Sequence, residues 1–201
     1  MRHLGGQPYD QEEDPCAGSR VEREAVRRGV DKAARVVVIG EDASWIWNIA
    51  NELFPGAICI VDRFHAKQHL SDLSKVLLGH ASPKGETWTK DRYDELDQGR
   101  IEDLLKNVGL YAKTFPEAKR CRIYFENNRE RMRYPEFWAQ GLSTSNGVVE
   151  GGCKPVAGGR PKKSGMHWSV PGANSVLALR CCIKSGRYDG FWKKRLERRA
   201  A

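Results

Sequence analysis

Residues 36–70 read VVVIGEDASWIWNIANELFPGAICIVDRFHAKQHL, and the pattern of this stretch decides the fold. A β-branched run at 36–39 stops at Gly40, and a helical pattern follows until Pro55 and Gly56. A second apolar run at 58–61 leads into another helical segment. Short apolar runs that alternate with helices are typical of parallel strands buried on both faces. The sequence therefore predicts an α/β fold with two parallel strands joined by a helix.

Polar side chains follow both predicted strands directly. Glu41 and Asp42 come after the first strand, and Asp62 and His65 come after the second. In open parallel sheets, the loops at the carboxyl ends of the strands converge on a crevice. We therefore expect these four side chains to gather at one edge of the sheet.

The rest of the chain is predicted to be mainly helical. Helical patterns cover residues 63–78, 88–108, 116–132 and 173–184, so 62–140 forms a mostly helical insertion between the strands and a helical carboxyl terminus. Residues 1–20 are polar and are predicted to be loop or disordered, whereas 79–86 is predicted to be a loop because it contains Pro83 and Gly85. No apolar run approaches the roughly 20 residues that a membrane span needs. We expect a cytoplasmic protein without a membrane partner.

The six cysteines form no CxxC pair. Several lie within apolar patterns, so buried free thiols are the expected state.

Positive charge is concentrated in the last quarter of the chain. The whole chain carries a net charge of +8, whereas residues 151–201 hold twelve Lys and Arg against Asp189 and Glu197, a net of +10. A basic end on a near-neutral body favours a polyanionic partner, above all nucleic acid. A solvated basic tail is the alternative.

Two kinds of metal site are compatible with the residues. Two-metal phosphodiester chemistry needs several carboxylates around Mg²⁺, and Asp42 or Glu41, together with Glu150 on a helix preceded by Ser143, Thr144 and Ser145, could supply them. His65 and His69 are spaced as zinc ligands on one helix face, although Ala66 replaces the general-base Glu of an HExxH protease. An unrelated metallohydrolase built on Asp62, His65 and His69 is therefore one hypothesis. The alternative is that Asp62 caps the helix and orients His65.

Four separated motifs resemble the carboxyl-terminal part of bacterial insertion-sequence transposases of the Kra type. They are GEDASWIWNIANELFPGAICIVDRFHAKQHL from Gly40, YFENNRERMRYPEFWAQGL from Tyr124, NGVVEGGCK from Asn146 and GMHWSVPGANSVLALRCCIKSGRYDGFW from Gly165. The resemblance covers about residues 25–192 and implies a DDE enzyme with an RNase H-like fold. Such enzymes use Mg²⁺ and three carboxylates to cut and rejoin DNA at the ends of their element. Their implied partners are DNA at the element ends and at the target, and further copies of the chain.

Carried over by position, the resemblance makes Glu150 the third carboxylate and places the second in GEDASWIW. Asp62 and His65 match an Asp-x-x-His signature that supports the site. Similar transposases read Gly-Asp-Gly-Ala where this chain has Gly40-Glu41-Asp42-Ala43, so Glu41 stands in the aspartate's column. By side-chain length we assign the second carboxylate and metal ligand to Asp42, with Glu41 as the alternative.

The strands that carry the family's first carboxylate have no counterpart before Val36. The chain is therefore expected to be an amino-terminally truncated fragment, residues 21–201 being the carboxyl-terminal part of a catalytic domain that is inactive alone. The basic end, 151–201, is expected to contact DNA phosphates through basic residues. The candidates are Lys154, Arg160, Lys162, Lys163 and Arg180. The alternative is a non-catalytic DNA-binding remnant of a transposase.

Overall fold

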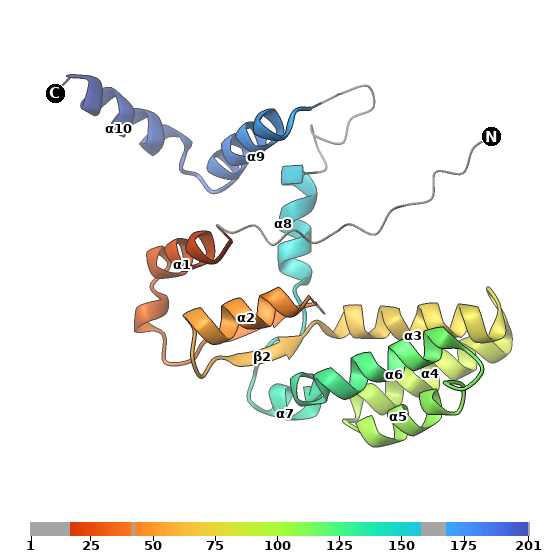
Figure 1. The fold of residues 1–201 in the computed structure, drawn as a ribbon. Helices are drawn as coiled ribbons and strands as arrows, with labels where there is room; N and C mark the ends of the chain where they lie inside the picture. The colour runs from red at the N-terminus through yellow and green to blue at the C-terminus, as the bar shows by residue number, and fades with distance from the viewer. Residues whose placement is uncertain (1–16, 42, 158–167, 201) are drawn as a thin grey trace, which may run out of the picture. The chain divides into compact units, whose positions relative to one another are not determined.

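The computed structural model describes residues 17–41, 43–157 and 168–200 (Figure 1). The chain divides into two units, Met1–Ser145 and Asn146–Ala201. Both strands of the described residues lie in the first unit, and the described elements of the second are all helices. The residues at the strand ends therefore belong to the first unit, and Glu150 and the basic end belong to the second.

The two predicted strands form a parallel pair. β1 (Val37–Gly40) pairs with β2 (Ile58–Val61), with Gly40 opposite Val61. α2 (Ser44–Leu53) makes the crossover that a parallel connection requires. In Figure 1, α2 lies above β2 and α7 lies below it. The prediction of an α/β unit with two parallel strands is confirmed.

Gly40 is required by the close approach of α2 to the end of β1. A Cβ atom at Gly40 would lie 2.8 Å from Cγ2 of Ile46 and 3.3 Å from the ring of Trp47. Because Ile46 is branched at Cβ, this methyl group cannot move away without shifting the helix. The contact fixes where β1 ends, and hence where the turn that carries Glu41 begins.

Helices make up the rest of the first unit. They are α1 (Ala17–Arg27), the 3-10 helix η1 (Val30–Lys32), α3 (Arg63–Leu78), α4 (Pro83–Asp97), α5 (Ile101–Gly109), α6 (Pro116–Asn128), the 3-10 helix η2 (Arg129–Met132) and α7 (Tyr134–Ala139). α3, α4, α5 and α6 pack on one another and form the predicted helical insertion. The apolar core runs from β2 into this insertion, through side chains such as Ile60, Leu70, Leu104 and Phe125. The strand pair and the insertion therefore share one core.

Several predicted boundaries are wrong. The helix predicted at 88–108 is two helices, because Gly99 adopts a left-handed φ of +70° between α4 and α5. α4 begins within the predicted loop 79–86, because Ser82 accepts a hydrogen bond from the backbone N–H of Gly85 at 3.0 Å and Pro83 fits the first helical turn.

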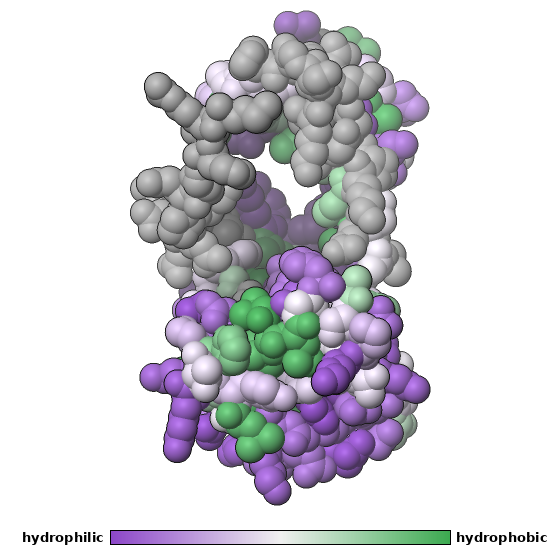
Figure 2. All heavy atoms as spheres, turned by 90° about the vertical axis from the view of Figure 1, so that its right-hand side faces the viewer, coloured by the Kyte–Doolittle hydropathy of each residue, from purple (hydrophilic) through white to green (hydrophobic). Residues whose placement is uncertain are grey.

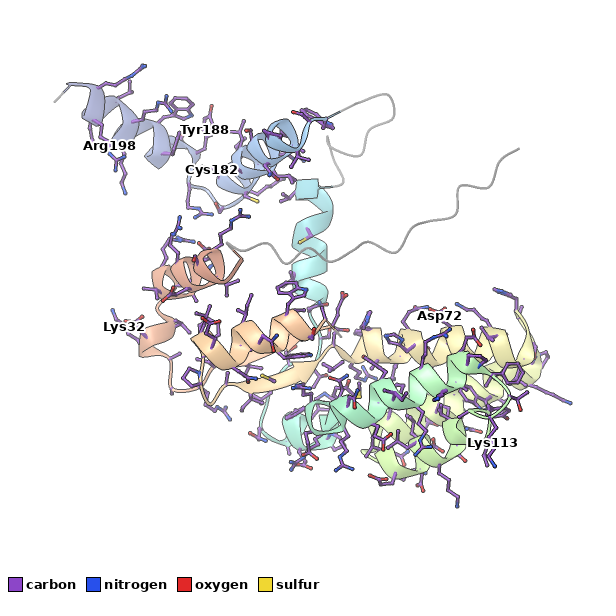
Figure 3. All side chains as sticks on the ribbon, in the orientation of Figure 1. Lys32, Asp72, Lys113, Cys182, Tyr188 and Arg198 are labelled. Carbon is purple, nitrogen blue, oxygen red and sulfur yellow. The ribbon has the colours of Figure 1, made fainter. Side chains whose placement is uncertain are left out.

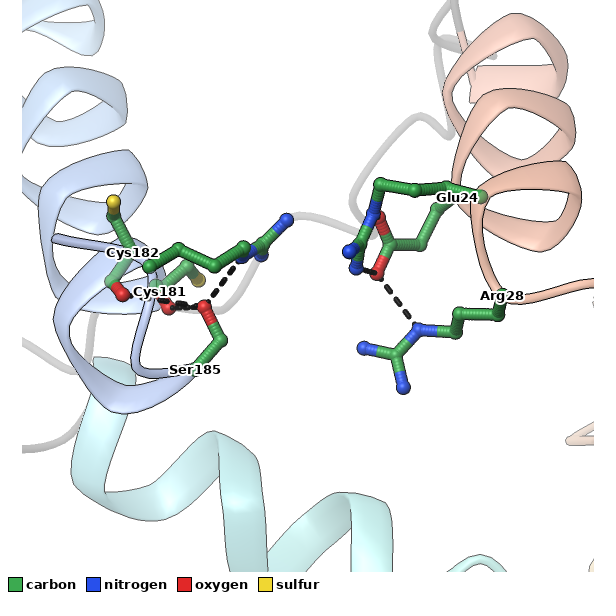
Figure 4. A network of polar contacts seen from close by, with 7 residues as sticks. Glu24, Arg28, Cys181, Cys182 and Ser185 are labelled. Atoms are coloured by element: carbon green, nitrogen blue, oxygen red, sulfur yellow. Dashed lines mark hydrogen bonds and ion pairs between the residues drawn. The ribbon is translucent and has the colours of Figure 1, made fainter. Parts of the chain in front are cut away.

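At the amino end, residues 17–20 are helical rather than loop, and residues 1–16 lie outside the described residues. α1 is stabilised on its surface by hydrogen bonds from Arg27 and Arg28 to Glu24 (Figure 4).

The second unit contains α8 (Gly147–Ala157), α9 (Val170–Lys184) and α10 (Tyr188–Ala200). α9 begins three residues before its predicted start, since Ser169 caps it by accepting from Gly172 N at 3.2 Å. The turn after α9 is held by Ser185 Oγ, which donates to Cys181 O at 2.7 Å and accepts from Arg187 Nε at 2.6 Å (Figure 4). The sequence predicted a helical end but did not resolve α10 as a separate helix.

The face shown in Figure 2 carries an apolar area surrounded by mostly hydrophilic side chains. Within the described ranges, no helix combines the length and apolar character needed to cross a membrane.

The described cysteines are free thiols, but only Cys121 is buried, so the prediction of buried thiols is right for that residue and wrong for the exposed Cys153 and Cys181. Burial raises the pKa of the Cys121 thiol to about 12, which makes it unreactive.

We predict that Gly40→Ala destabilises the protein by about 1–3 kcal/mol, because the new methyl group overpacks the β1–α2 contact. Urea unfolding followed by circular dichroism measures the change. Gly18→Ala in α1 is the matched control, since a Cβ there meets nothing within 4 Å, and it should stabilise by no more than about 1 kcal/mol. Equal unfolding free energies for Gly40→Ala and the wild type would contradict the packing described above.

Candidate functional site

Three backbone donors fix the start of α3, and one of them joins it to the end of β1. The N–H of Asp62 donates to Gly40 O at 2.7 Å, and the N–H of Arg63 donates to Thr144 O at 2.9 Å. The N–H of His65 donates to Oδ1 of Asp62 at 2.9 Å. Because the first N–H groups of a helix have no partner inside the helix, these bonds fix its position and direction. The interpretation of Asp62 as the helix cap is confirmed.

Thr144 has a role that the sequence did not indicate. It was a candidate cap for the helix containing Glu150, but it is buried in the first unit. Its Oγ1 accepts from Nε1 of Trp138 at 3.1 Å, and its carbonyl accepts from Arg63. No local pattern reveals such a contact, because Arg63 and Thr144 are far apart in the sequence. Thr144 therefore helps to place α3 rather than to begin α8.

Glu41, His65 and His69 form a row at the ends of the strands. Oε2 of Glu41 lies 4.0 Å from Nδ1 of His65, and Nε2 of His65 lies 3.3 Å from Nε2 of His69. The ring of His69 is in turn packed on Tyr124, with 4.2 Å between the ring centres. The predicted meeting of residues from both strand ends is thus observed for Glu41 and His65.

A partly buried ion cluster braces α3 from the opposite side. Arg63 donates to both carboxylate oxygens of Asp97, at 2.7 and 2.9 Å, and Lys67 Nζ lies 2.5 Å from the same group. Burial raises the pKa of Asp97, but the hydrogen bonds from Arg63 and Lys67 outweigh it, so the pKa lies below its usual value. Arg63 also lies over the ring of Trp138 at 5.4 Å. The cluster ties the first turn of α3 to the end of α4.

Tyr134 connects α7 to the last residue of β2. Its ring is fully buried, and its hydroxyl donates to Val61 O at 3.1 Å. Burial raises the pKa of this phenol, so the hydroxyl keeps its proton and remains a donor. The end of β2 is therefore fixed from the helical insertion as well as by β1.

The described residues do not by themselves make a magnesium site. Glu41 offers an accessible carboxylate, with 52% of its side chain exposed, but Asp62 is only 3% exposed and caps α3. Asp42 lies outside the described residues, and Glu150 is placed only as a backbone position in α8. In the described part of the chain, no group of three or more His, Cys, Asp or Glu is arranged to hold a metal ion. Mg²⁺ prefers several oxygen ligands, which Glu41 alone cannot supply.

The structure describes the predicted DNA-binding residues to different extents. Arg160, Lys162 and Lys163 lie outside the described residues, and for Lys154 only the backbone is described. Nε of Arg180 donates to Val156 O at 2.7 Å. Arg180 therefore joins α9 to α8, a structural role that its charge did not indicate.

α10 carries basic and aromatic side chains that the sequence reasoning did not single out as one surface. Phe191 and Trp192 are 50% and 42% exposed, and the guanidinium of Arg195 lies 5.6 Å from the ring centre of Trp192. Tyr188 and Arg198 project from the same helix (Figure 3). The signal available in the sequence was a group of aromatic residues followed closely by five basic residues on one helix.

No protein-family model, curated protein or solved structure matches this chain.

We predict that Asp97→Asn lowers the unfolding free energy by about 1–3 kcal/mol at pH 7, because it weakens charged hydrogen bonds to Arg63 and Lys67. The folded-state pKa of Asp97 lies below its ordinary value of 3.8. The contribution is therefore complete above about pH 5 and is lost as the pH falls through the folded-state pKa. Urea unfolding between pH 7 and pH 2 should show the wild-type advantage disappearing at the acid end.

Asp91→Asn, which removes an exposed carboxylate on the same helix, is the control and should change stability by no more than about 0.5 kcal/mol. An Asp97→Asn effect that is constant over the whole pH range would rule out the ionic contribution.

Proposed function

We propose that this chain is the carboxyl-terminal part of a DDE-type DNA transposase with an RNase H-like catalytic core. The observation that carries the proposal is the placement of Glu41 beside His65 at the carboxyl ends of two parallel strands. This is the edge of a parallel sheet where functional groups gather. The four-motif resemblance supplies the reaction class, which is the cutting and rejoining of DNA at the ends of an insertion sequence.

In this proposal the carboxylates hold Mg²⁺. Asp42 or Glu41 is the second carboxylate and Glu150 the third, and the bound ions would polarise the phosphodiester and activate the attacking oxygen. Asp62 and His65 are positioning residues: Asp62 fixes the start of α3, and this places the imidazole of His65 against the carboxylate of Glu41. An imidazole at that place limits the orientations that the Glu41 carboxylate can adopt.

The extra methylene of Glu41 is compatible with this role. Gly40 brings α2 close to β1, and the turn after Gly40 carries Glu41 towards the start of α3. A longer side chain can reach over that turn, whereas the family's aspartate would be shorter by one carbon. The contact with His65 is compatible with Glu41, the alternative to Asp42, as the second carboxylate.

A second candidate is a DNA-binding protein without catalytic activity. It is favoured by α10, whose basic side chains can neutralise phosphates and whose exposed Phe191 and Trp192 provide stacking surfaces. This candidate needs none of the carboxylates. The two candidates therefore differ in what removal of Glu41 or Glu150 does.

We predict that Mn²⁺, a paramagnetic substitute for Mg²⁺, broadens the amide NMR signals of Glu41 and Ala43 selectively. Glu41→Gln and Glu150→Gln should each weaken this binding by about tenfold or more, because each removes a charged ligand. Glu52→Gln, which changes an exposed carboxylate on α2, should leave it unchanged. Broadening that is unaffected by both ligand variants would exclude the DDE assignment.

A DNA-binding measurement on the same samples distinguishes the non-catalytic DNA-binding protein from the transposase. Fluorescence anisotropy with a labelled 30-base-pair duplex, measured between about 50 and 200 mM salt, gives the number of phosphates contacted from the slope of log affinity. If Mn²⁺ binding fails but salt-dependent DNA affinity survives in Glu150→Gln, the non-catalytic DNA-binding protein is the correct function. If both fail, neither candidate stands.

A further inference from the structure

Four planar side chains of the first unit form a series that begins in the core and ends at the surface. Tyr134 is fully buried, and its ring is stacked on that of Trp138, with 6.3 Å between the ring centres and 29° between the ring planes. The guanidinium of Arg63 lies over the rings of Trp138 and Phe64, 5.4 Å from each ring centre. Trp138 is 42% exposed and Phe64 is 61% exposed. The planar series therefore ends in an aromatic ring that is largely open to solvent.

The inner members of the planar series are fixed by hydrogen bonds. Arg63 donates to both carboxylate oxygens of Asp97, at 2.7 and 2.9 Å. The indole N–H of Trp138 donates to Oγ1 of Thr144 at 3.1 Å. Because these groups are already held in place, a ligand that adds to the exposed end loses little further freedom by ordering them. The ring of Phe64 thus lies on a preorganised support.

An exposed aromatic ring on such a support can accept another planar group. Nucleobases are planar, and proteins bind unpaired bases by stacking them on aromatic side chains, with cation–π contributions from arginine. We propose that Phe64 is a stacking site for an unpaired base of DNA, with Arg63 and Trp138 as positioning residues behind it. The inference rests on the proposed function for its choice of DNA as the substrate.

The charge around the planar series is suited to a polyanion. Arg63 and Lys67 carry two positive charges against the single carboxylate of Asp97 between them, which leaves a net charge of +1. On α7, the carboxylate of Glu136 accepts a hydrogen bond from Arg133 and is thereby neutralised. A net positive charge beside an exposed ring attracts the phosphate of a nucleotide whose base is stacked there. The same charge disfavours an acidic protein partner less than it disfavours a cationic one, so the stacking of a base is what the test must show.

The position of Phe64 relates the stacking site to the candidate catalytic edge. Phe64 directly precedes His65 in the first turn of α3, and His65 faces Glu41 at 4.0 Å. Consecutive side chains of a helix point in different directions, so Phe64 and His65 can contact different parts of one DNA strand. The stacking site therefore implies a substrate in which a base close to the reacting phosphodiester is unpaired.

The test is a titration of a labelled 12-base single strand and a labelled 30-base-pair duplex with the full chain, followed by fluorescence anisotropy at one salt concentration. Phe64→Leu keeps an apolar side chain but removes the ring, and it should weaken single-strand binding by at least about fivefold while leaving duplex binding unchanged. Phe64→Tyr keeps the ring and should retain the wild-type affinity. A strand that carries the fluorescent base 2-aminopurine should be quenched by the wild type and not by Phe64→Leu.

Two control variants separate this site from other exposed apolar side chains. Ile123→Ala changes a 44% exposed side chain on α6 and should leave single-strand binding unchanged. Phe191→Leu removes a 50% exposed ring from α10 and should leave the 2-aminopurine quenching unchanged. Because Phe64 is itself largely exposed, its substitution removes little packing within the protein.

Three results would overturn the proposal. They are the absence of 2-aminopurine quenching by the wild type, single-strand affinity that is unchanged in Phe64→Leu, and a loss of quenching in Phe191→Leu alone. The Mn²⁺ experiment contains no DNA and reports only on the carboxylates, so the stacking site and the transposase assignment fail independently. If Mn²⁺ binding fails while the Phe64 effect persists, the stacking site belongs to the non-catalytic DNA-binding protein.

Discussion

The hydrogen bond from the N–H of Asp62 to the carbonyl of Gly40 is the contact on which the rest of the site depends. At 2.7 Å, it continues the parallel pairing of β1 and β2 by one residue. It therefore sets the point where both strands end and where α3 begins. From this single register follows the approach of Glu41 to His65. A shift of the register by one residue would reverse the faces of the strand side chains and separate these groups.

The helical insertion and the segment that follows it maintain this register from outside the strand pair. Tyr134 binds the last carbonyl of β2, Thr144 binds the first turn of α3, and Asp97 holds Arg63 and Lys67. These contacts join residues that are 30 or more positions apart. A partly buried ion cluster costs desolvation energy, so its value lies in fixing one geometry more than in adding stability. The long-range polar contacts are thus concentrated around the first turn of α3.

Local sequence patterns were sufficient for the strand pair and its nearest helices. The apolar runs at 36–39 and 58–61, the crossover helix and the cap at Asp62 all follow from side-chain type and spacing. The break between α4 and α5 was missed because a helical pattern continues through Gly99, and only its left-handed φ shows that the chain turns there.

The sequence predicted the site only where the order of strands and helices along the chain determines which residues meet. The rule that strand ends converge brought Glu41 and His65 together, and helix periodicity placed His69 beside His65. The roles of Thr144 and Asp97 could not be predicted, because they depend on how distant helices pack. The assignment of Asp42 and Glu150 as metal ligands comes from the resemblance and stays a prediction.

The central claim is that the β1–β2 register fixes the start of α3, and native-state hydrogen exchange of the Asp62 amide tests it most directly. If the Gly40–Asp62 bond is formed as described, this amide should exchange only through global unfolding, with a protection factor that matches the free energy from urea unfolding. The amide of Ile58, which donates to Val36 O at 3.0 Å, should show similar protection at the other end of the strand pair. Rapid exchange at Asp62, with Ile58 still protected, would contradict the account.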